Sequence, residues 1–245
     1  MRDHNKAFCR LVAETFDCPG PVYEFGSFQV SGQEAYADLR GFFPGQDYVG
    51  CDFREGPGVD RLEDVTAISL PDRSVGTVIC LETFEHVFEV RRAFDEVFRI
   101  LRPGGVFILT SPFYFPLHSY PDDYWRITPS CLRRLLAPYG ARVVGSQGHA
   151  TSPHTVMSMA IKTPAPTDVL ARADDLVRSY GAWLSRAETM VPFRQKMRRA
   201  FSRVYRSKGE RNLVSGYYKA DFTIDVPAKV SGVIEVSTTA LARVG

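Results

Sequence analysis

The chain has 245 residues, with 30 Lys+Arg against 28 Asp+Glu and 44% hydrophobic residues. These values exclude wholesale disorder, collagen-like repetition and a coiled-coil rod, and they indicate a folded domain. No run of about 18 apolar residues is present, so no transmembrane helix is expected, and Met1–Lys6 leads into no signal-peptide-like stretch. The five cysteines form no CxxC pair, which indicates reduced thiols and a cytoplasmic protein.

Short β-rich runs alternate with amphipathic helical segments over the first 162 residues. Strands are expected at Val22–Phe25, Tyr48–Asp52, Val75–Leu81, Val106–Thr110, Ala141–Gly145 and Val156–Ile161. Helices are expected at Asn5–Phe16, Gln33–Phe42, Glu89–Leu101 and Pro129–Leu136. This alternation predicts an α/β fold, with a Rossmann-like, mostly parallel sheet and helices on both faces. Ligands bind such sheets beyond the carboxyl ends of the strands.

Pro164 and Pro166 mark a break in the chain. They predict a domain at residues 1–162 and a basic helical C-terminal extension at residues 163–245. The extension carries 14 Lys+Arg and 8 Asp+Glu, a net charge of +6, which leaves −4 on residues 1–162. The near-neutral total of +2 therefore hides two segments of opposite sign.

The first predicted strand runs into a glycine-containing turn. Gly26 lets the backbone turn sharply or approach a ligand, and Gly32 precedes a helix start. The run is not GxGxxG, so an ordinary strand-to-helix turn is an equal alternative. Asp52 ends the second strand, where nucleotide-binding α/β folds accept hydrogen bonds from ribose hydroxyls, and the other interpretation of Asp52 is a cap of the next turn.

The order of these motifs resembles class I S-adenosylmethionine-dependent methyltransferases. The resemblance covers residues 20–162 and depends on five runs: Glu24–Gly26, Tyr48–Asp52, Leu70–Asp72, Leu81–Val87 and Leu101–Gly105. The run His118–Pro129 is similar to a small-molecule or glycan branch that carries an H..P.DYWR.TP loop after the fifth strand. The first loop departs from the family's acid-x-Gly-x-Gly-x-Gly, because only Glu24, Gly26 and a late Gly32 remain.

The resemblance implies S-adenosyl-L-methionine as cofactor. It implies that Asp52 accepts both ribose hydroxyls, Asp64 accepts from the adenine amine and the Val65 N–H donates to the ring. The remaining cofactor residues that it implies are Glu24, Gly26, Ser27, Phe53, Leu81 and Glu82. A turn or helix cap is the alternative for Asp64, and a core position is the alternative for Phe53.

The acceptor pocket is expected on the loop after the fifth strand. His118 is the candidate general base, because its ordinary pKa lies near neutrality. Substrate contacts are expected from Tyr114, Asp122, Tyr124, Trp125 and Arg126. The alternative is that Tyr124, Trp125 and Arg126 hold the loop on the core. No covalent nucleophile and no metal site are predicted.

Eight basic residues crowd residues 194–211, with apolar residues between them. Three interpretations are open: a helix packed on the core or in a homodimer, a cover that attracts an anionic substrate, and contact with a membrane surface or nucleic acid. The leading function is methyl transfer to O or N of a small molecule or sugar by direct in-line displacement. The alternative is a non-catalytic binding or scaffold protein with the same fold, which uses its basic helix for an anionic partner.

Overall fold

The structure is a computed structural model that describes residues 2–32, 34–118, 122–190 and 217–226. Its described residues form one eight-stranded sheet in the order β3-β2-β1-β4-β5-β7-β6-β8. The strands are β1 (Val22–Phe25), β2 (Tyr48–Asp52), β3 (Arg61–Leu62), β4 (Val75–Leu81), β5 (Leu101–Pro112), β6 (Ala141–His149), β7 (Ser152–Ile161) and β8 (Ala220–Asp225).

The first five strands run parallel, and β7 enters antiparallel between β5 and β6. From β1 the chain builds the sheet outward to β2 and β3, and it then crosses back to add β4 and β5 on the other side. The topology therefore reverses between β1 and β4. In open α/β sheets the crevice at the carboxyl ends of such strands is where ligands bind.

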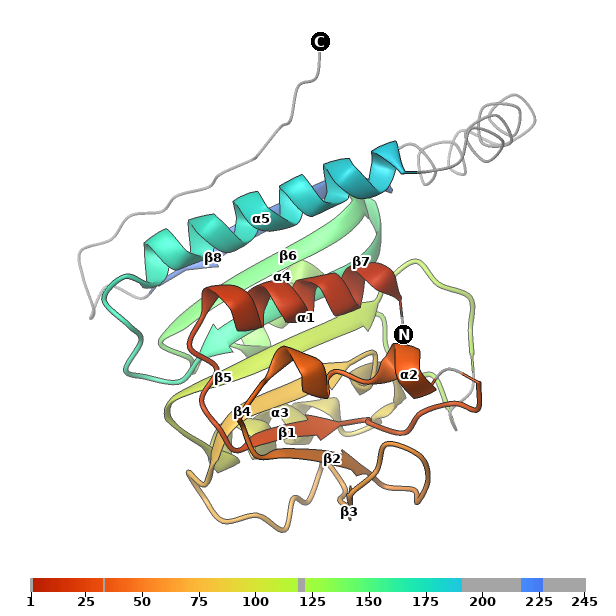
Figure 1. Ribbon diagram of the computed structural model, residues 1–245, viewed down its shortest axis with the longest axis vertical. Helices are drawn as coiled ribbons and strands as arrows, with labels where there is room; N and C mark the ends of the chain where they lie inside the picture. Colours follow the sequence, from red (N-terminus) through yellow and green to blue (C-terminus); the bar gives the residue numbers. More distant parts are fainter. Residues whose placement is uncertain (1, 33, 119–121, 191–216, 227–245) are drawn as a thin grey trace.

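Helices cover both faces of the sheet (Figure 1). On one face α1 (Asp3–Thr15) and α5 (Val169–Thr189) lie side by side, and their apolar residues share a core cluster with inward-facing strand residues. On the other face α3 (Val90–Ile100) and α4 (Pro129–Leu135) pack over a second cluster. The sheet is thus buried on both sides, which explains why every residue of β4 is buried.

The predicted α/β fold with a mostly parallel sheet and helices on both faces is confirmed. The bounds of β1, β2 and β4 agree with the sequence prediction, and β5 starts earlier, at Leu101, which pairs with Val75. The helix expected at Gln33–Phe42 is wrong: the chain forms α2 (Glu34–Ala37) and then a short 3-10 turn, η1 (Arg40–Phe42). Asp38 accepts a hydrogen bond from the Arg40 N–H at 3.0 Å, and this local bond competes with helix continuation.

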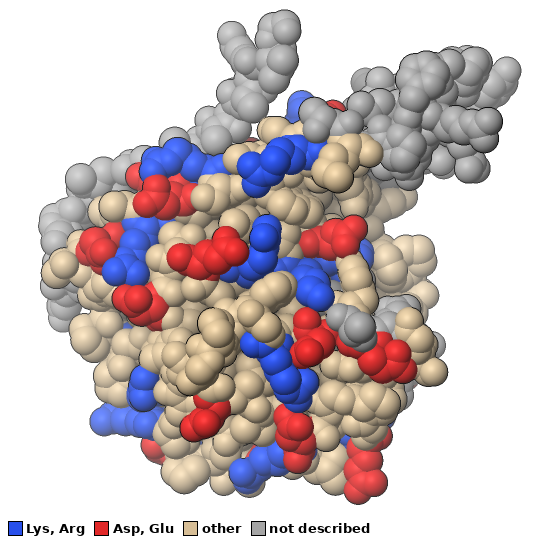
Figure 2. Space-filling model, viewed as in Figure 1, with Lys and Arg blue, Asp and Glu red and all other residues tan. Residues whose placement is uncertain are grey.

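The described part of the C-terminal segment packs into the same core. In α5, Leu176 and Tyr180 are buried against the α1 face, and β8 pairs antiparallel with β6. The basic run at 194–211 lies outside the described residues, and the division at residue 162 stays a prediction. On the face shown in Figure 2 the Lys/Arg and Asp/Glu side chains are interspersed. None of the described helices is long and apolar enough to span a lipid bilayer.

If α5 belongs to the core, shortening its buried side chains must destabilise the whole domain. We expect Leu176→Ala to lower the free energy of unfolding by about 2–5 kcal/mol, because a fully buried leucine leaves a cavity. The matched change on the solvent side is Arg178→Ala, whose exposed ion pair with Asp175 is worth about 0.5 kcal/mol or less. Chemical denaturation measures both, and equal small effects would contradict the packing of α5.

Candidate functional site

A cavity of about 840 Å³ opens at the carboxyl ends of the strands, where the sheet topology reverses. Gly26 borders it after β1, Asp52 at the end of β2, Glu82 and Thr83 after β4, and Pro112 at the end of β5. Its volume falls within the range of small-molecule and cofactor sites, and the lining mixes aromatic side chains with a few carboxylates. The cavity therefore lies where the sequence predicted a ligand.

The loop after β1 is fixed by backbone contacts. The N–H groups of Gly26 and Ser27 both donate to the Cys51 carbonyl, at 2.8 and 3.0 Å. Gly26 has a φ of +84°, and a Cβ placed on it lies 2.2 Å from Thr83 Oγ1. This position requires glycine because the loops after β1 and β4 touch here. Ser27 is buried beside the cavity and does not line it.

Glu24 lies beneath the cavity and does not border it. Its Oε2 accepts a hydrogen bond from the Tyr48 hydroxyl at 2.6 Å. Burial raises the pKa of Glu24 to about 7, against the opposite effect of the Tyr48 hydrogen bond. The carboxyl thus ties β1 to β2, and a direct contact between Glu24 and a ligand in the cavity has no support from its position.

Asp52 is buried and lines the cavity. The Arg54 backbone N–H and Nε both donate to its Oδ1, at 3.1 and 3.3 Å. No described residue bonds to Oδ2, so one carboxylate oxygen remains for a ligand. The Arg54 guanidinium lies over the Phe28 and Phe53 rings, 4.5 and 5.0 Å from their centroids, and the exposed Phe53 ring forms part of the cavity wall.

Asp64 and Val65 line the same side of the cavity. The Thr66 N–H and hydroxyl donate to Asp64 Oδ1, at 2.8 and 2.7 Å. Asp64 therefore closes a local turn, as one of its two sequence interpretations expected, while its side chain stays exposed at the cavity. Val65 is buried, and its atoms form part of the cavity wall.

Arg2 and Glu82 meet at the opposite side. Arg2 Nε donates to Glu82 Oε1 at 2.8 Å, and the two side chains form an ion pair. Glu82 has a φ of +54°, an unusual conformation for a non-glycine residue, and its N–H bonds to the Thr110 carbonyl. Leu81 lies behind it in the core and does not border the cavity. The sequence did not indicate that Arg2, which lies just before α1, borders the cavity.

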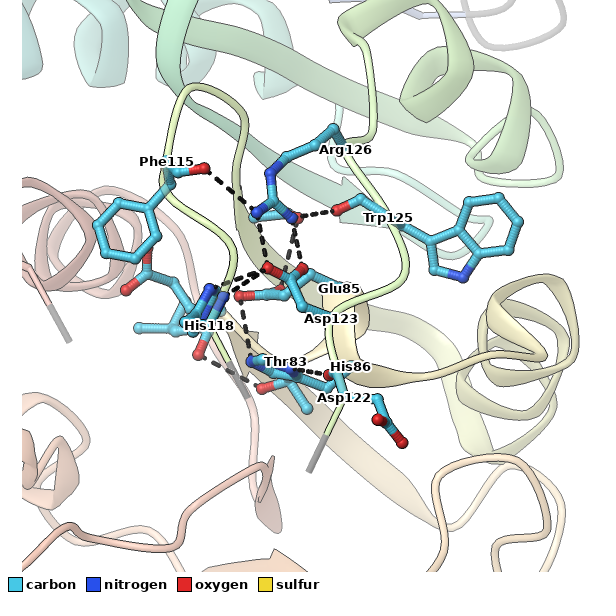
Figure 3. A network of polar contacts seen from close by, with 12 residues as sticks. Thr83, Glu85, His86, Phe115, His118, Asp122, Asp123, Trp125 and Arg126 are labelled. Carbon is cyan, nitrogen blue, oxygen red and sulfur yellow. Dashed lines mark hydrogen bonds and ion pairs between the residues drawn. The ribbon is translucent and has the colours of Figure 1, made fainter. Parts of the chain in front are cut away.

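The loop after β5 is organised by Asp123 (Figure 3). Arg126 donates to both Asp123 oxygens, at 2.5 and 2.7 Å, and His118 Nδ1 lies 3.0 Å from Oδ2. The Arg126 hydrogen bonds lower the pKa of Asp123 to about 2. Of these residues His118 lines the cavity, while Arg126 points to the loop itself.

Tyr124 and Trp125 hold this loop on the loop after β4. Their backbone N–H groups donate to the Glu85 carbonyl, at 2.7 and 3.2 Å, and the indole N–H donates to Val87. The Trp125 ring points away from the polar network in Figure 3. Neither residue lines the cavity, and the same is true of Tyr114 and Asp122. The sequence allowed two interpretations of Tyr124, Trp125 and Arg126. Their contacts agree with the second one, in which they hold the loop on the core.

Sequence reasoning assigned His86 no role at the site. It belongs to η2 (Phe84–His86), the turn after β4, and its ring packs edge-on against His118 with centroids 4.8 Å apart. Its Nδ1 donates to the Asp122 carbonyl at 2.5 Å, and the ring lines the cavity. Its place in the sequence, after an acid and near a helix start, favours a structural hydrogen-bonding role, and its contact with a histidine from another loop is a tertiary feature.

Two comparisons with known sequences bear on this site. Residues 44–109 match a family model described as a methyltransferase domain. A "Probable S-adenosylmethionine-dependent methyltransferase" of Mycolicibacterium smegmatis is 33% identical over 123 residues. This part of the chain is thus similar to methyltransferase domains. The alignment covers 46% of this chain and 45% of that relative, so less than half of the relative's length is represented.

Solved structures with similar coordinates have low sequence identity. A structure titled "SAM dependent methyltransferase" from Archaeoglobus fulgidus is 17% identical, with a TM-score of 0.47, over 64% of this chain and 92% of that one. The 1,6-didemethyltoxoflavin-N1-methyltransferase of Burkholderia thailandensis is 16% identical, with a TM-score of 0.48, over 66% and 79%. The fold assignment above stands on the strand order of this chain.

The contact of Gly26 with Thr83 can be tested with a pair of glycine substitutions. Gly26→Ala combines a positive φ with a clash at Thr83, and we expect it to lower the free energy of unfolding by about 2–4 kcal/mol. Gly32→Ala has a similar φ of +82° but no atom within 4 Å, so about 1 kcal/mol is expected. Urea denaturation separates them, and equal losses would remove the steric argument.

Glu24 predicts a pH dependence of stability. Its pKa is raised from 4.5 to about 7 in the folded state, so the folded protein binds more protons than the unfolded chain in this interval. The stability that Glu24 contributes is present below pH 4.5 and is lost as the pH rises through 7. Between pH 5 and 8 we expect Glu24→Gln to remove about 1–3 kcal/mol of this decline. Denaturation curves at both pH values measure it, and an unchanged slope would contradict the burial of an ionisable group here.

Proposed function

We propose that the protein is an S-adenosylmethionine-dependent methyltransferase that transfers the methyl group directly to an O or N atom of a small molecule or sugar. The observation that carries the proposal is the position of Asp52. It is a buried carboxylate at the end of β2, it lines the cavity at the topological switch, and it keeps Oδ2 without a described partner. The family match over residues 44–109, which includes β2 and β4, supports it.

The residues around the cavity fit the parts of this cofactor. The fixed loop at Gly26 lets the backbone pass close to a ligand without a Cβ in the way. Asp52 Oδ2 accepts from ribose hydroxyls, and Phe53, Asp64 and Val65 border the space for the adenine ring. Glu82 places negative charge beside the end of β4, which suits a sulfonium cation. When bound, S-adenosylmethionine supplies an electrophilic methyl group, so no nucleophile of the chain is needed.

In this proposal the acceptor enters on the side of His118. That ring lies at the cavity between Phe115 and the turn after β4, and Asp123 orients it through Nδ1. Its Nε2 bonds to no described residue and can accept the proton of an acceptor group. Arg2, held over the Phe115 ring at 5.2 Å and paired with Glu82, brings guanidinium N–H donors to the same wall and favours an acceptor with a strongly polar group.

Calorimetric titration with S-adenosylhomocysteine tests the cofactor assignment. We expect one binding site, and we expect Asp52→Ala to weaken the binding by at least about 10-fold, since the hydrogen bonds of a charged acceptor to the ribose are worth about 1.5–3 kcal/mol. Asp72→Ala is the matched control, because Asp72 pairs with Arg99 on the surface away from the cavity. Absence of binding to the unaltered protein would refute the methyltransferase proposal, and normal binding by Asp52→Ala would refute the ribose contact.

A further inference from the structure

Three side chains that can bind metals converge from two different loops, two of them at the wall of the cavity and the third, Glu85, buried behind it. Glu85 and His86 come from the turn after β4, and His118 comes from the loop after β5. One donor atom from each of them lies within 4.8 Å of the other two. Two imidazoles and a carboxylate form a frequent protein ligand set for catalytic zinc and non-haem iron, and such sites keep coordination positions open for water or substrate.

The outer contacts of both histidines are those of metal ligands. His86 Nδ1 donates to the Asp122 carbonyl at 2.5 Å. His118 Nδ1 donates to the Pro116 carbonyl at 3.3 Å and lies 3.0 Å from an oxygen of the Asp123 carboxylate. Because these partners are acceptors, each ring holds its proton on Nδ1 and leaves the Nε2 lone pair free. Metal-bound histidines are typically held in this way, with the second nitrogen on a carbonyl or carboxylate that fixes the tautomer.

Glu85 supplies an independent observation. The side chain is fully buried, and its Oε1 has no hydrogen-bond partner among the described residues. This oxygen faces His86 Nε2 at 3.8 Å, too far for a hydrogen bond. The other oxygen has a contact from Ser111 Oγ at 3.5 Å, which is the limit for such a bond. A buried carboxylate oxygen without a partner is costly, and a cation between it and the two imidazoles would satisfy it.

We propose that Glu85, His86 and His118 bind a divalent transition-metal cation of the Zn²⁺ class at the wall of the cavity. Metal–ligand distances of about 2.0–2.2 Å place neighbouring donors roughly 3–3.5 Å apart, so the 3.8 Å between Glu85 Oε1 and His86 Nε2 closes by a small rotation. The nitrogen-rich set disfavours Mg²⁺ and Ca²⁺, which take oxygen ligands. Burial, with a smaller effect of the nearby Glu82 and Asp123 charges, raises the pKa of Glu85 to about 8, and a bound cation would oppose that shift by favouring the ionised carboxylate.

The consequence for catalysis rests on the proposed function. The open positions of the cation face the same cavity, so an acceptor oxygen can bind there and lose its proton to water at a lowered pKa. A lone pair of the acceptor oxygen then forms the bond to the methyl carbon, and the electron pair of the carbon–sulfur bond goes to sulfur. In this arrangement the cation activates the acceptor, and His118 acts as a ligand with Asp123 behind it, in place of a direct proton acceptor.

Titration of chelator-treated full-length protein with Zn²⁺, in competition with a chromophoric chelator, tests the site. We expect one tight equivalent, and we expect His86→Ala and His118→Ala each to weaken binding by at least about 10-fold. His149→Ala is the matched control, because His149 lies in β6 and contacts Thr151 away from the cluster. Cys131→Ser serves as a second control, since Cys131 is an exposed thiol. Co²⁺ in place of Zn²⁺ should give a visible d–d absorption band that both histidine variants lose.

Two results would overturn the site: no equivalent bound below millimolar Zn²⁺, or binding that the histidine variants leave unchanged. Circular dichroism of each variant shows that it is folded, and Glu85→Gln, which keeps the shape of the side chain, must also lose affinity. Titration with S-adenosylhomocysteine is run separately on the same proteins. Cofactor binding without Zn²⁺ binding refutes the metal site alone, and Zn²⁺ binding without cofactor binding refutes the proposed methyl transfer alone.

Discussion

The close approach of Gly26 to Thr83 is the contact on which the shape of the cavity depends. It joins the loop after β1 to the loop after β4, at the point between β1 and β4 where the strand order reverses. Thr83 Oγ1 also donates to the Phe25 carbonyl at 3.1 Å, so the two loops share a hydrogen bond as well as a steric contact. With these loops fixed, Asp52 and Glu82 both border the same cavity.

Arginines from separate parts of the chain balance the carboxylates of this region. Arg54 follows β2 and bonds to Asp52, Arg2 precedes α1 and bonds to Glu82, and Arg126 bonds to Asp123 before α4. Each pair fixes a carboxylate by a charge-assisted hydrogen bond. Glu85 differs from these acids, because it is buried between the loops and no described cation neutralises it through a hydrogen bond. That contrast is why the cluster with His86 and His118 supports a bound cation.

The sequence predicted the fold well where periodicity decides it. The apolar runs of β1, β2 and β4 have the predicted bounds, because a strand buried on both faces reads as a continuous hydrophobic segment. The break at Asp38 was missed, because a side-chain hydrogen bond to the backbone overrides helical spacing. The extent of β6 and β8 depends on partners far along the chain, which a local pattern does not contain.

The sequence predicted the residues of the candidate site that lie at strand ends, but not those that reach it through tertiary packing. Position at a strand end indicated Gly26 and Asp52, the family resemblance implied Glu82, and all three line the cavity. Glu24 carries the same motif signal, but its side chain turns below the sheet edge to Tyr48. Arg2 and His86 reach the cavity only through tertiary packing, so no spacing in the sequence revealed them.

The central claim is that the cavity at the β1–β4 switch holds S-adenosylmethionine. A crystal structure of the protein grown with S-adenosylhomocysteine tests it most directly. The account predicts density for the nucleoside with its ribose hydroxyls within hydrogen-bond distance of Asp52 Oδ2 and its homocysteine chain passing over Gly26. A nucleoside bound elsewhere, or no density for a nucleoside in this cavity at saturating ligand, would contradict the account.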